Sequence, residues 1–114
     1  MLKKLTALFP RKSANLRATL KGVDGFTGRG AISFTAWSNG ARQMEVSLRG
    51  VAGRQAQVRA TVDPSVSIVV ENGRADAKLD TRTGDALPPC VQNEQLTIVQ
   101  NDIVILTGQL LPTR

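Results

Sequence analysis

The chain has 114 residues, a formal net charge of +6, and 41% hydrophobic but only 4% aromatic residues. This length predicts a single domain with one modest core built from Val, Ile, Leu and Ala. The chain has no His, no Tyr and one Cys, which excludes imidazole metal ligands and catalytic imidazole bases. We therefore expect a protein that is not an enzyme and that binds no metal or cofactor.

The first 13 residues predict a basic amphipathic segment ahead of a folded domain at 14–114. Its apolar residues recur near helical spacing until Pro10 ends the run: Leu2, Leu5, Leu8 and Phe9. This apolar run is too short for a secretory signal peptide, and no run approaches the ~20 residues of a membrane span. We expect a cytoplasmic protein without a transmembrane segment.

The rest of the chain alternates apolar and polar residues between turn signals. The alternation predicts eight short strands, at 15–21, 30–37, 41–49, 55–62, 66–71, 74–80, 95–100 and 103–110. A long loop at 81–94 contains Gly84, Pro88 and Pro89. The pattern predicts an all-β fold, an antiparallel Greek-key β-sandwich of about eight strands, with a short N-terminal amphipathic helical segment.

The turn Ser38-Asn39-Gly40 sets the register of the second and third strands. A three-residue loop pairs Phe34 with Met44 and keeps the apolar side chains on one face, whereas a two-residue loop would pair Phe34 with Glu45. This predicts a type I turn with Gly40 left-handed in a bulge. Trp37 then lies on the outer face.

A second hairpin is predicted around Asn72-Gly73. A two-residue loop there produces three apolar pairs: Val70–Ala75, Ile68–Ala77 and Val66–Leu79. The fourth strand is expected to point its own apolar residues inward: Ala56, Val58, Ala60 and Val62.

The last hairpin turns at Asn101-Asp102, and both of its faces are apolar. One face carries Leu96, Ile98, Ile103 and Ile105, and the other carries Val99, Val104 and Leu106. Both faces should therefore be covered. We expect one to join the core and the other to meet the N-terminal segment or another subunit.

Charge is divided unequally along the chain. Residues 1–60 carry eleven Lys or Arg against two acidic residues, a net charge of +9, and residues 61–114 carry four against seven, a net charge of −3. This asymmetry predicts a polarised surface, suited to self-association or to an anionic partner.

Several strand and turn segments resemble a known family. They are Leu16-Arg17-Ala18 through Gly30-Ala31, Met44 through Leu48, Gly73-Arg74-Ala75 through Asp85, Pro88, Leu96-Thr97-Ile98 and Ile105 through Gly108. Together they resemble small bacterial β-sandwich domains related to the CHRD (chordin repeat) domain and, more distantly, to the copper/zinc superoxide dismutase fold. The resemblance implies a sandwich and no activity, because the dismutase metal ligands are His. CHRD domains are usually extracellular, whereas the residues themselves predict the cytoplasm.

Two surfaces are candidates for binding. The candidate partner-binding residues are apolar: Leu5, Leu8, Phe9, Trp37, Val99, Val104 and Leu106. The candidate polyanion-binding residues are basic: Arg17, Lys21, Arg29, Arg42, Arg49 and Arg59. Arg54 is basic as well, and all of these could also be a solubilising surface.

Two other features have ordinary structural readings. Asp76 and Asp80 share a strand face, with Asp85 beyond, and a solvated acidic face explains them better than a cation site. Cys90 follows two prolines, and a small buried hydrophobe explains it better than a reactive thiol that lacks a base.

Two functions remain open from the sequence. The first is a non-catalytic β-sandwich module for self-association or protein-partner binding, as a homo-oligomer or with another protein. The alternative is polyanion binding, for example to nucleic acid, through the basic N-terminal half. No small-molecule substrate is evident.

Overall fold

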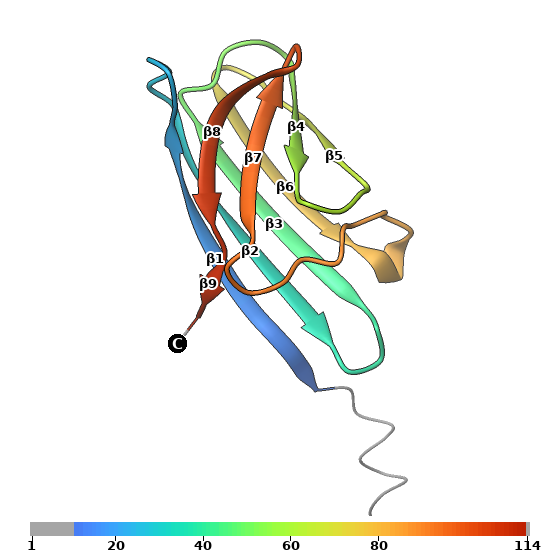
Figure 1. The fold of residues 1–114 in the computed structure, drawn as a ribbon. Helices are drawn as coiled ribbons and strands as arrows, with labels where there is room; N and C mark the ends of the chain where they lie inside the picture. The colour runs from blue at the N-terminus through green and yellow to red at the C-terminus, as the bar shows by residue number, and fades with distance from the viewer. Residues whose placement is uncertain (1–10, 114) are drawn as a thin grey trace, which may run out of the picture.

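The computed structural model describes residues 11–113, which form one antiparallel sheet that is nearly closed into a barrel (Figure 1). Its strands are β1 (Lys12–Gly22), β2 (Arg29–Trp37), β3 (Arg42–Arg49), β4 (Gln55–Arg59), β5 (Val66–Val69), β6 (Arg74–Asp80), β7 (Gln95–Gln100), β8 (Ile103–Gln109) and β9 (Leu111–Pro112). A single 3-10 turn, η1 (Thr81–Thr83), follows β6. The all-β antiparallel prediction is confirmed. The N-terminal segment predicted at 1–13 lies mostly outside the described residues. Its last two residues, Lys12 and Ser13, belong to strand β1.

The strands follow the order β5-β4-β7-β8-β1-β2-β3-β6, and β9 pairs with β1. The sheet bends between β8 and β1, where Lys21 pairs with Thr107 and Gly22 with Leu106. Strands β1, β2, β3 and β6 form one half and β5, β4, β7 and β8 the other, and the halves face each other across the core (Figure 1). Gly108 lies at this bend, where a Cβ would collide with the carbonyl oxygen of Thr19.

The core takes one side of every long strand, as the alternation predicts. Its largest fully buried side chains include Phe34, Ile32, Met44, Leu48 and Ile98. Each fully buried side chain of this size contributes about 1.5–3 kcal/mol relative to its exposed state. The outward alternate positions are therefore the ones available for function.

The predicted turn between β2 and β3 is confirmed. Phe34 pairs with Met44, and Gly40 has a φ of 90°. The amide of Trp37 donates to the carbonyl of Ala41 at 2.9 Å, and the amide of Gly40 donates to the carbonyl of Trp37 at 3.0 Å. The three-residue loop thus holds the register that the apolar pattern requires.

The predicted pairing of β5 with β6 is wrong beyond the turn. Glu71 and Arg74 exchange two backbone hydrogen bonds, so Asn72-Gly73 does form a two-residue turn. The strands then separate, because β5 pairs with β4 and β6 pairs with β3. The three apolar pairs predicted across this hairpin do not form, although Val66, Ile68, Val70 and Ala75 are all buried.

β4 ends three residues earlier than predicted. The amide of Thr61 donates to a carboxylate oxygen of Glu94 at 2.7 Å instead of to a neighbouring strand. The chain leaves the sheet there, so Ala60 lies beyond the strand and Val62 is exposed rather than inward.

The last hairpin turns at Asn101-Asp102 as predicted, but a bulge shifts its register. Val99 pairs with Val104, whereas Ile98 pairs with Leu106 and leaves Ile105 as the extra residue. Leu106 therefore points into the core and not onto the outer face, and Ile105 is buried as well. Among the described residues, no helix is long and apolar enough to cross a membrane.

Candidate anion-binding face

The outer face of the β1–β2–β3–β6 half carries a row of four basic residues on four adjacent strands. Lys21 lies opposite Arg29, and Arg29 lies opposite Arg49. Arg49 in turn lies opposite Arg74. We call Lys21, Arg29, Arg49 and Arg74 the cationic row. At the usual strand spacing of about 4.8 Å it spans roughly 14 Å.

The cationic row is weakly neutralised from within the protein. Arg49 contacts a carboxylate oxygen of Asp76 at 3.2 Å. Within residues 11–113, no ion pair joins Lys21, Arg29 or Arg74 to a carboxylate. Like charges directly opposite each other destabilise a sheet. The row therefore costs stability, and among residues 11–113 Arg49 is its one member with a carboxylate contact that compensates.

A hollow of about 450 Å³ adjoins the row on the same face. Its lining includes the short side chains of Ala31, Ser33 and Ser47, with Arg17 and Lys78 among the longer ones. Lys78 pairs with Glu45 at 3.6 Å, whereas no ion pair joins Arg17 to a described carboxylate. The carboxylates of Glu45 and Asp76 also line the hollow, so an anionic group that entered it would lie closest to balance beside Arg17 and the cationic row.

The six basic residues singled out in the sequence do not share one face. Arg17, Lys21, Arg29 and Arg49 lie together on the outer face of the β1–β2–β3–β6 half. Arg59 lies on β4, in the other half, and contacts Asp102 at 3.5 Å.

Arg42 belongs to the structure of the loop at 81–94 rather than to this face. It has the same strand parity as inward-pointing Met44. Its guanidinium donates to the carbonyl of Leu87 at 2.9 Å, and its Nε is buried without a described partner. Arg42 therefore lies apart from the cationic row, and its predicted role in polyanion binding stays a prediction.

Arg74 completes the row and was missed in the sequence analysis. It stands directly after the Asn72-Gly73 turn, where the sequence presents it only as a turn-flanking residue. Its place opposite Arg49 depends on β6 pairing with β3, which no local pattern indicates. The alternation of β6 places the Arg74 side chain on the outer face, but it does not indicate which strand lies beside it.

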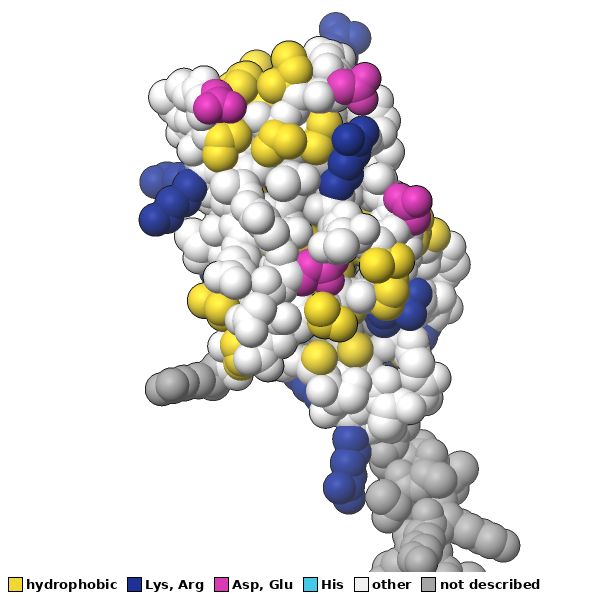
Figure 2. Space-filling view, viewed as in Figure 1, with side chains coloured by type: hydrophobic (Ala, Val, Ile, Leu, Met, Phe, Trp, Pro, Cys, Tyr) yellow, Lys and Arg dark blue, Asp and Glu magenta, His cyan; other side chains and the backbone are white. Residues whose placement is uncertain are grey.

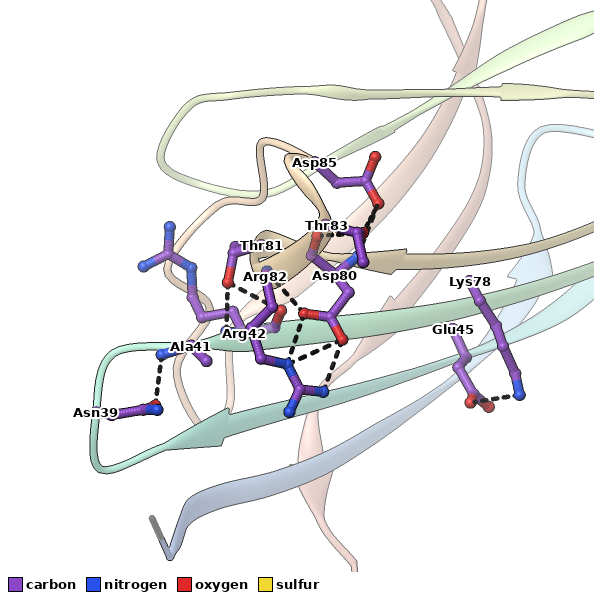
Figure 3. Close-up of polar contacts among 10 residues, drawn as sticks. All are labelled: Asn39, Ala41, Arg42, Glu45, Lys78, Asp80, Thr81, Arg82, Thr83 and Asp85. Carbon is purple, nitrogen blue, oxygen red and sulfur yellow. Dashed lines mark hydrogen bonds and ion pairs between the residues drawn. The ribbon is translucent and has the colours of Figure 1, made fainter. Parts of the chain in front are cut away.

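Trp37 lies on the same outer face but at the far end of β2. Arg82 stacks on its ring, with the guanidinium carbon 4.7 Å from the ring centroid. Figure 3 shows Arg82 turned toward Asp80, whose carboxylate it contacts at 2.7 Å. This contact lowers the pKa of Asp80 through the hydrogen bond from Arg82. Arg82 thus covers part of the Trp37 ring.

The other acidic side chains considered for a cation site have structural partners. Asp85 accepts a hydrogen bond from the amide of Asp80 at 2.8 Å, and Asp76 pairs with Arg49. Among residues 11–113, no group of three His, Cys, Asp or Glu side chains comes together as a metal site.

The candidate partner-binding residues are dispersed. Leu5, Leu8 and Phe9 lie outside the described residues. Leu106 is 0% exposed and Val99 only 3%, whereas Val104 is 39% exposed. Of the apolar face expected on the last hairpin, Val104 alone is accessible.

Cys90 is buried, with 7% of its surface exposed. Burial, with a smaller contribution from the charge of Glu94, raises the pKa of its thiol to about 12. A thiol in this environment stays protonated at neutral pH and is a poor nucleophile.

No protein-family model matches the chain, and no curated protein matches it. The resemblance to CHRD domains accordingly stays a prediction.

Proposed function

We propose that the protein is a non-catalytic binding module that holds a polyanion, such as a nucleic-acid backbone, on its cationic row. The observation that carries this proposal is the direct register of Lys21, Arg29, Arg49 and Arg74. An external anion turns this destabilising arrangement into a favourable one, because it supplies the counter-charge that the fold omits.

The proposed site binds the phosphate charges of a nucleic acid and does not contact its bases. Trp37 follows Arg29 by eight positions on β2, which is roughly 26 Å at about 3.3 Å per residue. The ring is therefore too far from the row to stack on a base held there, and Arg82 already lies against it. Contacts to phosphate position a nucleic acid without selecting its sequence.

The test is binding of a short labelled DNA duplex at several salt concentrations. Four phosphate contacts predict that log K falls with log salt with a slope of about −3 to −4. Arg29→Gln should weaken binding and reduce the slope by about one, whatever the DNA sequence.

The matched control is Arg59→Gln, which removes the same charge from the other half of the sheet. If both variants weaken binding equally, the row is not the binding surface and net charge alone attracts the DNA. No binding even at low salt would reject the proposal.

The second candidate function is self-association, and the charge distribution favours the opposite face for it. On the outer side of the β5–β4–β7–β8 half, Arg59 is the one charged strand residue; the others are Gln55, Gln57, Ser67, Val69, Gln95, Thr97, Val99, Val104, Thr107 and Gln109. Two copies of a chain with a net charge of +6 would repel each other least across this face.

Sedimentation equilibrium at low and high salt tests this candidate. A dimer through the neutral face should persist at both salts and should weaken in Val104→Lys, because the substitution places a charge in the contact. Exposed Val91, in the loop at 81–94, provides the matched control as Val91→Lys. A monomer at both salts would exclude self-association at the concentrations used.

A further inference from the structure

The connections β1–β2, β3–β4, β5–β6 and β7–β8 all lie at one end of the barrel (Figure 1). We call residues 23–28, 50–54, 70–73 and 101–102 the loop end. Hydrogen bonds tie these loops together: the amide of Val51 donates to the carbonyl of Gly73, and the amide of Val23 to the carbonyl of Ile105. The side-chain amide of Gln100 donates to the carbonyl of Ala52 at 2.6 Å. The loop end is therefore a connected surface.

Exposed apolar side chains gather at this end. Phe26 is 45% exposed and Ile103 is 55% exposed, and Val69 and Val104 are exposed next to the turns. Figure 2 shows hydrophobic side chains gathered at the end of the molecule where Figure 1 places these loops. Phe26 also lines a pocket of about 240 Å³ with Val51 and Ile105. Large contiguous apolar patches mark docking surfaces for proteins or membranes, and these side chains supply the apolar part of such a surface.

Cations bracket the same loops. Lys21 and Arg29 flank the first loop, Arg49 and Arg54 flank the second, and Arg74 follows the third. The acidic residues of the loop end are Asp24, Glu71 and Asp102, and Asp102 is paired with Arg59. The loops therefore carry apolar and acidic side chains, and the strand ends at their base carry the positive charge.

We infer that the loop end docks on an anionic lipid bilayer, with Phe26 and Ile103 entering the interface and the cationic row facing the headgroups. Anionic headgroups attract nearby Lys and Arg, and apolar tips gain from the acyl boundary. A second copy of this chain is a poorer occupant, because it would bring two sets of unpaired cations together. This inference rests on the proposed function, since it names the polyanion as a lipid surface.

The test is co-sedimentation of the full chain with phosphatidylcholine vesicles, with and without phosphatidylglycerol. We expect binding to the anionic vesicles and little to the neutral ones. Removing one cation by Arg29→Gln should weaken binding about fivefold. The double variant Phe26→Ser/Ile103→Ser should weaken it roughly tenfold or more, because half-exposed apolar side chains leave the interface.

Val91→Ser is the matched control, since Val91 is exposed but lies in the loop at 81–94, at the opposite end of the barrel. It should bind anionic vesicles like the original chain. Retained vesicle binding in Phe26→Ser/Ile103→Ser would overturn docking through the loop end.

A fluorescence measurement fixes the orientation independently of affinity. Trp37 is the one Trp of the chain and lies at the end opposite the loops, so its emission should not change on vesicle binding. Phe26→Trp in a Trp37→Phe background should shift to shorter wavelength. No shift in that variant would contradict insertion of the first loop.

The two proposals fail in different ways. If the chain binds DNA with the predicted salt slope but does not bind anionic vesicles, the lipid inference is wrong and the proposed function stands. If Phe26→Ser also weakens binding of single-stranded DNA in that case, the loop end is a nucleic-acid surface. If neither DNA nor vesicles bind, both proposals are wrong.

Discussion

Glu94 connects two loops that the sequence presents as separate. One carboxylate oxygen accepts the amide of Thr61 at 2.7 Å, and the other accepts the amide of Val91 at 2.9 Å. A carboxylate has two acceptor atoms for this task, whereas an amide has one. This contact explains why β4 ends at Arg59. No sequence pattern predicts the contact between Thr61 and Glu94, because these two residues are 33 positions apart in the chain.

Cys90 makes folding stability depend on pH in a defined window. Its thiol pKa is about 12 in the folded chain and about 8.5 in an unfolded chain. The folded state therefore favours the protonated thiol. The stabilisation is complete below about pH 8.5 and is lost as pH rises toward 12, at up to about 1.4 kcal/mol per pH unit. Denaturant unfolding at a series of alkaline pH values measures this slope.

The composition limits the other groups that could contribute to the pH dependence measured for Cys90. With no His and no Tyr in the chain, few other groups titrate just above pH 8.5. Cys90→Ala should unfold with almost no pH dependence between about pH 8.5 and 9.5, below the range in which Lys side chains ordinarily titrate. The native thiol should also resist iodoacetamide until denaturant is added. Rapid alkylation of the folded chain, or an unchanged slope in Cys90→Ala, would contradict the buried protonated thiol.

At the scale of single elements, local patterns predicted the strands well where one turn fixes the register. The parity of Phe34 and Met44 required a three-residue loop, and β2 and β3 have that register. The inward residues of β5 and β6 were also predicted, because alternation fixes which face a side chain takes. Their pairing was not, since β5 and β6 find their partners in different halves of the sheet.

The bulge in β8 shows the limit of alternation as a guide. Ile103 through Leu106 are four consecutive apolar residues, so the sequence does not distinguish which of them face the core. The extra residue at Ile105 brings Leu106 into the core and leaves Val104 outside. An apolar run of this kind marks a place where strand geometry, and not composition, decides the exposed surface.

At the scale of the whole molecule, the charge asymmetry of the sequence becomes a difference between two faces. The outer positions of β1, β2, β3 and β6 hold seven Lys or Arg against three Asp or Glu, a net charge of +4: Lys12, Arg17, Lys21, Arg29, Arg49, Arg74 and Lys78 against Glu45, Asp76 and Asp80. The other half has one charged outer strand residue. The sequence predicted an uneven distribution of charge. The basic face is set by the order of the strands in the sheet and not by the two halves of the sequence. Arg74 therefore belongs to the basic face, and Arg59 does not.

A row of like charges should also be visible in the stability of the free protein. Arg29 faces Lys21 on one side and Arg49 on the other, so Arg29→Gln removes two repulsive cross-strand pairs. We expect the free energy of unfolding to rise by about 0.2–1 kcal/mol at low salt. The gain should shrink at high salt, because salt screens exposed charges. Arg59→Gln, which instead breaks the contact with Asp102, should give no such gain. Denaturant unfolding of both variants at low and high salt measures the difference.

If Arg29→Gln weakens anion binding while it stabilises the fold, the row is a binding feature kept at a cost in stability. If it destabilises the fold at low salt, the cations are not in repulsive contact, and the main support for an anion-binding face is lost.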